Sequence, residues 1–241
     1  MKIPKAKKIP LKSINHGITR IDNYDWMRLT DKQKSSNKKD AQTKRVLEYI
    51  KKENDFTEKQ LKNTKKLQKK LFKEMVGRIK KDDSSIPYEY NGYWYVKKYK
   101  KDQEYPIYSR MKRSLKSKKK VLLDVNLLAK GSDYYNLLFD ANLVSPDNKW
   151  LLFCVDNSGR RMYDIFIKNI ETGKILKYKI ENCDSEPVWC NDSKTIFYLK
   201  KNETTLIGEK LFKHQIGGNI KNDVLVYQET DQSYDNYIYK T

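Results

Sequence analysis

The sequence predicts a mainly β protein with an N-terminal α-helical arm, in which the strands form an incomplete β-propeller. Three observations predict this fold. Apolar residues recur at helical spacing only before Ile79, strand-like alternation begins after Ser85, and the second half repeats itself about every 45 residues. The 241 residues therefore divide into an extended and helical arm (residues 1–81) and a strand region (residues 82–241).

The arm combines an extended lead-in with two predicted helices. Residues 1–39 contain two prolines and a polar tract, which predict little regular structure. Asp40 suits the N-cap of the first helix, and Asp55 with Glu58 has the spacing of a capping box that would begin a second helix ending near Ile79. The second helix has an apolar stripe, formed by Leu61, Leu67, Leu71, Phe72, Met75 and Ile79. A basic amphipathic helix can bind membranes or calmodulin-like grooves, but packing against its own protein is the favoured interpretation.

The strand region opens with a hairpin signal. Asn91-Gly92 lies between alternating tyrosines and predicts a tight turn, and further strands are predicted over residues 105–111 and 121–124. Trp150 and Trp189 each stand at the start of a later strand and are expected in the core, not on a surface that stacks nucleic-acid bases.

Two successive units then share one order of turn and strand. Turn 144–149 precedes strand 150–155, and turn 189–194 precedes strand 195–200. Such a period is typical of a β-propeller with one four-stranded blade per repeat. Residues 82–241 would supply about three and a half blades, fewer than the four to eight that close a propeller, and residues 237–241 are predicted as a last strand.

The net charge of +20 arises entirely in the first half of the chain. Residues 1–120 carry 36 Lys+Arg against 14 Asp+Glu, whereas residues 121–241 carry 15 against 17. Nucleic-acid binding is one explanation of such a charge. However, only 8 of the 51 basic residues are Arg, the residue suited to bidentate phosphate and guanine contacts. We therefore expect solvated lysines and no specific nucleic-acid partner.

Motifs of catalysis and metal binding are missing from the sequence. No G-x-S-x-G, HExxH, P-loop or G-x-G-x-x-G pattern occurs, and His16 and His214 stand without a neighbouring nucleophile motif. Asp82-Asp83 is interpreted as a solvated turn, since adjacent residues of an extended chain point to opposite faces. We expect no catalytic, cofactor-binding or metal-binding residue here, and no cofactor.

Cellular location is predicted from the cysteines and from hydropathy. Cys154, Cys183 and Cys190 are an odd number without CxxC spacing, which favours a reducing compartment. No apolar run approaches 18 residues, and the N-terminus lacks the apolar region of a signal peptide. A cytoplasmic protein without membrane contact is expected.

The order of several segments resembles one known family. The segments that carry the resemblance are His16–Arg28, Val46–Asn54, Glu74–Ile79, Asn91–Tyr95, Glu104–Arg110, Leu122–Asn126, Ser145–Asn148, Glu171–Gly173 and Val188–Ser193. They cover nearly the whole chain and are similar to the N-terminal portion of the prolyl oligopeptidase family of serine peptidases, above all its oligopeptidase B (protease II) branch.

The resemblance implies a function for a longer assembly. Family members join a seven-bladed propeller to an α/β-hydrolase domain that carries a Ser-Asp-His triad, and the oligopeptidase B branch cleaves short peptides after Arg or Lys. The chain resembles only about the first third, and none of His16, Ser145, Asp147 and His214 matches a catalytic position. We therefore expect an inactive N-terminal part, with residues 1–81 packing on a hydrolase domain that could be encoded separately. The alternative is a stand-alone or split-gene binding module built on a partial propeller.

Overall fold

The computed structural model describes residues 2–240 and divides the chain into two compact units. We call them the arm unit (Met1–Ile79) and the propeller unit (Lys80–Thr241). The division expected from the sequence, between residues 81 and 82, lies two residues further along the chain. Each unit is described by itself below.

The arm unit begins with a β-hairpin that the sequence analysis did not predict. β1 (Leu11–Asn15) pairs antiparallel with β2 (Ile18–Asp22), and His16 and Gly17 form the turn with φ angles of 52° and 75°. Both angles are left-handed, as a two-residue type I′ turn requires. The expectation of little regular structure over residues 1–39 was wrong here. Every residue of both strands is exposed, so no buried apolar face marks the hairpin in the sequence.

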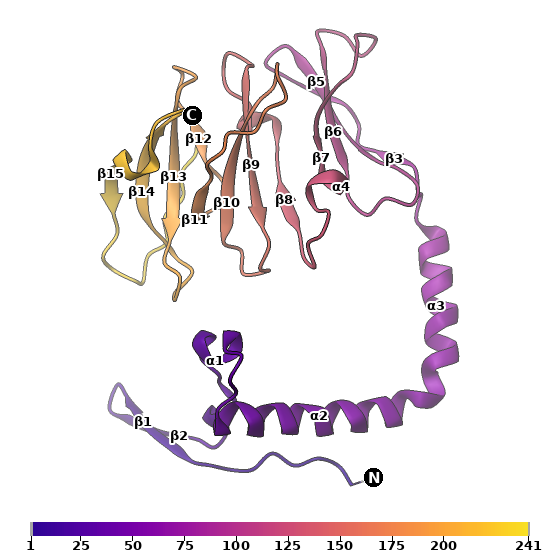
Figure 1. Cartoon of the computed structure of the whole chain (residues 1–241), viewed down its shortest axis with the longest axis vertical. Helices are drawn as coiled ribbons and strands as arrows, with labels where there is room; N and C mark the ends of the chain where they lie inside the picture. The colour runs from indigo at the N-terminus through magenta and orange to yellow at the C-terminus, as the bar shows by residue number, and fades with distance from the viewer. Residues whose placement is uncertain (1, 241) are drawn as a thin grey trace. The chain divides into compact units, whose positions relative to one another are not determined.

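Helices form the rest of the arm unit. They are η1 (Asp25–Met27), α1 (Asp31–Ser35), α2 (Ala41–Leu61), η2 (Lys62–Thr64) and α3 (Lys65–Arg78). Asp40 is the N-cap of α2, as predicted, and accepts a hydrogen bond of 2.7 Å from the backbone N–H of Thr43. The predicted helix start at Asp55 was wrong: α2 continues through this residue, whose carboxylate pairs with Lys51 at 2.7 Å. The chain changes direction later, at η2, where α2 and α3 meet (Figure 1).

Few side chains of the arm unit are buried. Trp26, Thr43 and Val46 are 2–8% exposed, and the Trp26 indole N–H donates to the Lys7 carbonyl at 2.8 Å. Helix α3 has no buried residue. The six residues of the apolar stripe are 46–66% exposed. The arm unit therefore lacks a core along α3.

Three blades of antiparallel strands make up the propeller unit (Figure 1). The first blade contains β4 (Tyr88–Tyr90), β5 (Tyr93–Tyr99), β6 (Ile107–Lys112) and β7 (Lys120–Asp124), with β3 (Asp83–Ser84) paired to β5. The second contains β8 (Asn136–Leu138), β9 (Trp150–Asp156), β10 (Tyr163–Asn169) and β11 (Ile180–Cys183). The third contains β12 (Val188–Trp189), β13 (Thr195–Lys201), β14 (Gly208–Gln215) and β15 (Val224–Gln228). Short helices lie between strands at α4 (Val125–Leu128), η3 (Ala141–Leu143) and η4 (Ile220–Asn222).

The turns confirm both sequence signals for the blades. Asn91 and Gly92, with φ angles of 48° and 76°, join β4 to β5 in the predicted hairpin. The repeat is also visible in the hydrogen bonds, because Ser145 N–H donates to the Trp150 carbonyl and Cys190 N–H to the Thr195 carbonyl, both at 2.9 Å. These donors lie 45 residues apart in equivalent turns. The sheets are open, so the prediction of a mainly β, incomplete propeller is confirmed.

Two apolar clusters hold the blades together. One lies between the first and second blades and includes Leu122, Leu151 and Phe153, whereas the other contains Leu152, Ile165 and side chains of the third blade. β9 contributes alternate residues to the two clusters, as the two-residue period of a strand requires. Burial on both faces explains why β9 is apolar from Trp150 through Val155.

Two details complete the description of the fold. Residues 237–240 do not form the predicted strand, and Thr241 lies outside the described residues. Among residues 2–240, no helix has the length and apolar character needed to cross a membrane.

Candidate functional site

The first strand of each blade lies at the edge of its sheet, and these three edges border one cavity. β4, β8 and β12 each pair with a single neighbour, β5, β9 and β13. The cavity beside them has a volume of about 730 Å³. Its lining is formed by Tyr90, Leu138, Phe139, Asp140, Asn142, Leu143, Ser185, Glu186, Pro187, Val188, Trp189, Ile238, Tyr239 and Lys240. Propeller blades surround a central channel, so this cavity is the channel side of the three blades.

Carboxylates give this channel cavity its polar character. Asp140 is held in place, because its Oδ1 accepts hydrogen bonds from the Tyr88 hydroxyl and from the Ala141 N–H. Burial, together with this bond to Asp140, raises the pKa of Tyr88 well above its ordinary value. Glu186 is exposed and makes no hydrogen bond or ion pair with residues 2–240. Its carboxylate is therefore available to pair with a cationic group in the cavity. Lys240 is the one basic residue of the lining.

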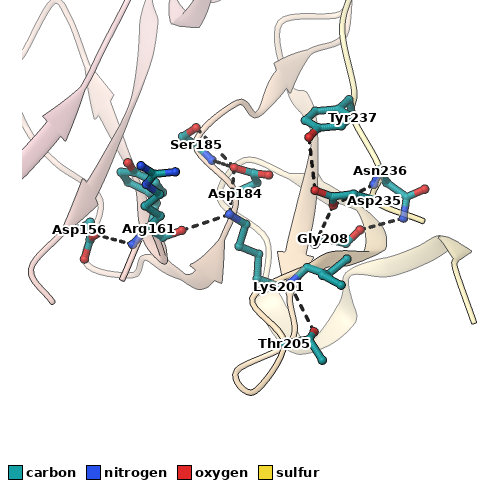
Figure 2. A network of polar contacts seen from close by, with 12 residues as sticks. Asp156, Arg161, Asp184, Ser185, Lys201, Thr205, Gly208, Asp235, Asn236 and Tyr237 are labelled. Atoms are coloured by element: carbon teal, nitrogen blue, oxygen red, sulfur yellow. Dashed lines mark hydrogen bonds and ion pairs between the residues drawn. The ribbon is translucent and has the colours of Figure 1, made fainter. Parts of the chain in front are cut away.

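A polar network fixes the two chain segments that carry the outer wall of the cavity (Figure 2). Lys201 Nζ lies 3.5 Å from Asp184 Oδ1 and donates to the Arg161 carbonyl at 3.2 Å. Asp235 Oδ1 accepts a bond of 3.2 Å from the Gly208 N–H, and Asn236 Nδ2 donates to the Gly208 carbonyl at 2.8 Å. These bonds attach residues 184–186 and 235–240 to the third blade. These two segments of the cavity wall are thereby held in place although neither of them is a strand.

Asp156 organises the neighbouring turn between β9 and β10. Its Oδ1 accepts hydrogen bonds from the Ser158 N–H (2.7 Å), the Ser158 hydroxyl (2.8 Å) and the Gly159 N–H (2.9 Å), and its Oδ2 accepts one from the Arg161 N–H (2.8 Å). Burial acts to raise the pKa of Asp156, but these hydrogen bonds outweigh it and hold the pKa below 3.8. The ionised carboxylate therefore stabilises the fold.

The substitution Asp156→Asn tests this role through pH. We expect the variant to lose about 1.5–3 kcal/mol of unfolding free energy at pH 7, because the bond to Arg161 and the charge are lost. A lowered folded-state pKa gives stability that is present above the unfolded pKa of about 4 and is lost as the pH falls through the folded value. The difference between the two proteins should therefore shrink below pH 3.8 in urea unfolding. A difference that stays constant from pH 7 to pH 3 would show that the charge of Asp156 contributes nothing.

His214 belongs to a buried polar cluster in the third blade. Its Nδ1 lies 2.6 Å from Asp223 Oδ1 and its Nε2 lies 2.9 Å from the Tyr178 hydroxyl, while Tyr198 donates to Asp223 Oδ2 at 2.8 Å. The His214 side chain is fully buried. A catalytic histidine needs a nucleophile within reach. Both ring nitrogens are already bonded, neither to a serine nor to a cysteine, so His214 is structural.

The other residues singled out in the sequence also have structural positions. Ser145 is buried, donates to Asp147 Oδ1 at 2.6 Å and accepts from the Trp150 N–H, so it closes a turn. His16 lies exposed in the β1–β2 turn. No reactive serine, histidine and carboxylate come together among residues 2–240. In the same range, no group of three or more His, Cys, Asp or Glu could hold a metal ion.

Comparison with known proteins decides the family. The family described as "Prolyl oligopeptidase, N-terminal beta-propeller domain" matches residues 4–239, nearly the full chain. The chain belongs to the prolyl oligopeptidase family. The resemblance found in the sequence is thus confirmed, and the chain corresponds to the N-terminal portion of prolyl oligopeptidase family peptidases.

Individual relatives agree with this assignment. The chain is 36% identical to dipeptidyl aminopeptidase BI of Pseudoxanthomonas mexicana, over 95% of this chain and 32% of that protein. It is 26% identical to Protease 2 of Moraxella lacunata, over 100% of this chain and 34% of the relative. The structure of oligopeptidase B from Leishmania major superposes with a TM-score of 0.85 at 26% identity, covering 99% of this chain and 34% of that one. The chain spans about a third of the length of these prolyl oligopeptidase relatives.

Two features of this prolyl oligopeptidase propeller were not found in the sequence. The partners of His214, Tyr178 and Asp223, lie 36 and 9 residues away and carry no motif. The channel carboxylates Asp140 and Glu186 come from different blades. Only the 45-residue period could have predicted that Asp140 and Glu186 line one cavity, since it aligns equivalent positions of successive blades.

Proposed function

We propose that this chain is the arm and first blades of an oligopeptidase B-like serine endopeptidase that hydrolyses short peptides after Arg or Lys, and that the chain alone is inactive. The observation that carries the proposal is the match of residues 4–239 to the propeller domain of a peptidase family, in a chain without a reactive serine-histidine pair among its described residues. The catalytic serine, aspartate and histidine would then lie in a hydrolase portion outside these 241 residues.

The exposed stripe of the arm supports a contact with that hydrolase portion. Its six apolar side chains are 46–66% exposed, although burying a Leu or Phe side chain contributes roughly 1.5–3 kcal/mol. An amphipathic helix of this kind gains most of its stability from a partner that covers its apolar face. In this proposal α3 packs on the hydrolase portion and anchors the propeller to it.

The channel cavity supports a preference for basic peptides. Glu186 presents an unpaired carboxylate to the cavity, and an opposite charge favours entry of a cationic substrate. One relative, however, is named a dipeptidyl aminopeptidase, which offers release of N-terminal dipeptides as a second candidate reaction. The two reactions differ in the substrate, because blocking the N-terminus abolishes dipeptide release and leaves endopeptidase cleavage.

Hydrolysis by the purified chain tests the proposal. We expect no turnover of fluorogenic peptides ending in Arg or Lys, with either a free or a blocked N-terminus, and no labelling by a fluorophosphonate that reacts with activated serines. Labelling and turnover that copurify with the 241-residue chain, and disappear together with the inhibitor, would contradict the proposal.

Self-association of the isolated chain is a second expected result. The stripe on α3 and the edge strand β15, where Val224, Leu225, Val226 and Tyr227 are 45–59% exposed, both offer surfaces that promote association. We expect light scattering to show oligomers at micromolar concentration and the double substitution L71E/F72E to reduce them. The matched control K69Q/K70Q also lowers the net charge by two, on the same turns of α3 but outside the stripe. Equal effects of the two pairs would show that charge, and not the stripe, causes association.

A partial-propeller binding module is the alternative function. Such a module would bind a peptide or protein without any hydrolase portion, and it would be monodisperse. Location is also proposed here: the three cysteines are free, two of them buried, and this supports a cytoplasmic protein.

A further inference from the structure

A second hollow of the propeller unit is strongly basic. It has a volume of about 350 Å³ and lies where the β6–β7 loop of the first blade meets two turns of the second blade. The lining consists of Tyr93, Arg110, Lys112, Lys118, Lys120, Asp147, Asn148, Lys149, Ile170 and Glu171. Five basic side chains face two carboxylates, an excess of three positive charges. We call this hollow the basic pocket. The basic pocket and the channel cavity share no lining residue.

Arg110 lies at the base of the basic pocket as a buried cation without a carboxylate partner. The residue is 5% exposed, its Nη1 and Nη2 donate to the Asn148 Oδ1 and carbonyl at 3.4 and 2.8 Å, and its guanidinium carbon lies 3.9 Å from the ring centre of Tyr93. The Tyr95 hydroxyl lies against the same guanidinium across the β5–β6 pair, and neither this hydroxyl nor the Arg110 Nε–H has a well-aligned hydrogen-bond partner among residues 2–240. Buried charges are normally paired, because leaving a cation unpaired in the interior is costly. The positive charge of Arg110 therefore has neutral partners and no carboxylate within ion-pair distance among the described residues.

Hydrogen bonds fix the loop that carries two lysines of the basic pocket. Arg113 N–H donates to the Gly92 carbonyl at 3.0 Å and the Trp94 indole to the Arg113 carbonyl at 3.3 Å, which fastens the loop that carries Lys112 and Lys118. Neither lysine has a carboxylate within ion-pair distance in the described part of the chain. Lys112 and Lys118 therefore give the basic pocket positive charge that no carboxylate of the described residues balances by direct pairing.

We propose that the basic pocket binds a small phosphate ester or polyphosphate with two linked phosphoryl groups. Each terminal nitrogen of Arg110 carries a second N–H beside the one that bonds to Asn148, and these N–H groups together with the lysines suit phosphate oxygens. Two linked phosphoryl groups carry a charge of about −3 near neutral pH, which matches the excess of three positive charges better than the charge of about −2 on a single group. The volume of about 350 Å³ lies at the lower end of the range for small-molecule sites. A ligand here would join the first and second blades, since both contribute to the lining.

Nucleic acid is the macromolecular ligand that could also bind these lysines. A test has to distinguish it from a small phosphate compound. A duplex spreads its phosphates along an extended backbone, and its binding requires a surface stripe of cations. In the basic pocket the arginine is buried, and two carboxylates, Asp147 and Glu171, belong to the same lining as the lysines. This arrangement favours a compact anion.

Calorimetric titration of the 241-residue chain with pyrophosphate, at about 0.1 M NaCl, tests the proposal. We expect saturable binding of one pyrophosphate per chain, at least tenfold tighter than inorganic phosphate. The variant R110K, which keeps the charge and loses the fork, should weaken binding about tenfold. Because a change at a buried residue could prevent folding, K112Q/K118Q is the second variant, and it should also weaken binding about tenfold. The matched control K100Q/K101Q removes two exposed lysines from the opposite end of the first blade and should change binding less than twofold.

Three results would overturn the proposal. One is the absence of saturable pyrophosphate binding by the folded wild-type chain. Another is equal weakening by K112Q/K118Q and K100Q/K101Q, which would show that only the overall charge attracts the anion. The third is binding of a short DNA duplex more tightly than pyrophosphate, weakened by K112Q/K118Q, which would assign the lysines to nucleic acid. From the sequence we expect duplex binding at about 0.15 M salt no tighter than roughly 10⁻⁶ M and without sequence preference.

Discussion

Replacing Asp223 by alanine should destabilise the propeller unit by about 3–5 kcal/mol. The Asp223 side chain is 5% exposed and pairs with the fully buried His214 at 2.6 Å, and it also accepts a hydrogen bond from Tyr198. The substitution leaves the Nδ1 of His214 and the hydroxyl of Tyr198 buried without a partner. Each such orphaned group costs about 1–3 kcal/mol. Domains are stable by only about 5–15 kcal/mol, so urea unfolding should show a much lower midpoint.

The double variant H214L/D223A tests whether the loss in D223A comes from leaving His214 without its partner. Replacing a buried polar pair by apolar groups is often nearly neutral, whereas removing one partner is not. We therefore expect the double variant to be more stable than D223A. A double variant that loses the sum of both single effects would show that His214 and Asp223 stabilise the blade independently.

Truncating Trp189 to alanine should also remove about 3–5 kcal/mol of unfolding free energy. The indole is 3% exposed, packs in the cluster between the second and third blades, and donates to the Leu143 carbonyl at 2.8 Å. The substitution creates a cavity and leaves this buried carbonyl without its donor. Both losses act at the wall of the channel cavity, so the blades should separate more easily there.

Trp150 provides the matched control for Trp189. It stands at the equivalent start of a strand but is only half-buried and packs against the edge of the same cluster. We expect W150A to lose clearly less than W189A, when both are compared by thermal or urea unfolding. Equal losses of unfolding free energy in the two variants would show that the deeper burial of Trp189 at the channel side does not determine its contribution to stability.

The fold could be predicted from the sequence where a local signal and the tertiary structure agree. Asn91-Gly92 requires left-handed backbone and sits between alternating tyrosines, and the turns that begin at Ser145 and Cys190 repeat the same hydrogen bond. The break between α2 and α3 was misplaced, because a capping-box spacing at Asp55 does not end a helix whose backbone bonds continue. The β1–β2 hairpin was not predicted because none of its strand residues is buried, so the sequence has no apolar alternation there.

The sites could not be predicted because their residues meet only in three dimensions. Arg110 and Asn148 lie 38 residues apart, in strands and turns of different blades. Neither residue type carries chemistry that a spacing rule would reveal. The unpaired Nε–H of Arg110 and the free Glu186 carboxylate become visible only once the burial and contacts of every neighbour are known. The family, in contrast, could be recognised from the order of short segments along the whole chain.

Reconstitution of hydrolysis tests the proposed function most directly. The measurement mixes this chain with the separately produced remaining two thirds of a relative, such as dipeptidyl aminopeptidase BI of Pseudoxanthomonas mexicana, and follows cleavage of fluorogenic peptides. The account predicts that hydrolysis appears or rises at least tenfold on addition of this chain, that L71E/F72E abolishes the gain, and that K69Q/K70Q preserves it. Hydrolysis by the remainder that is unchanged by this chain, or a gain that L71E/F72E leaves intact, would contradict the account.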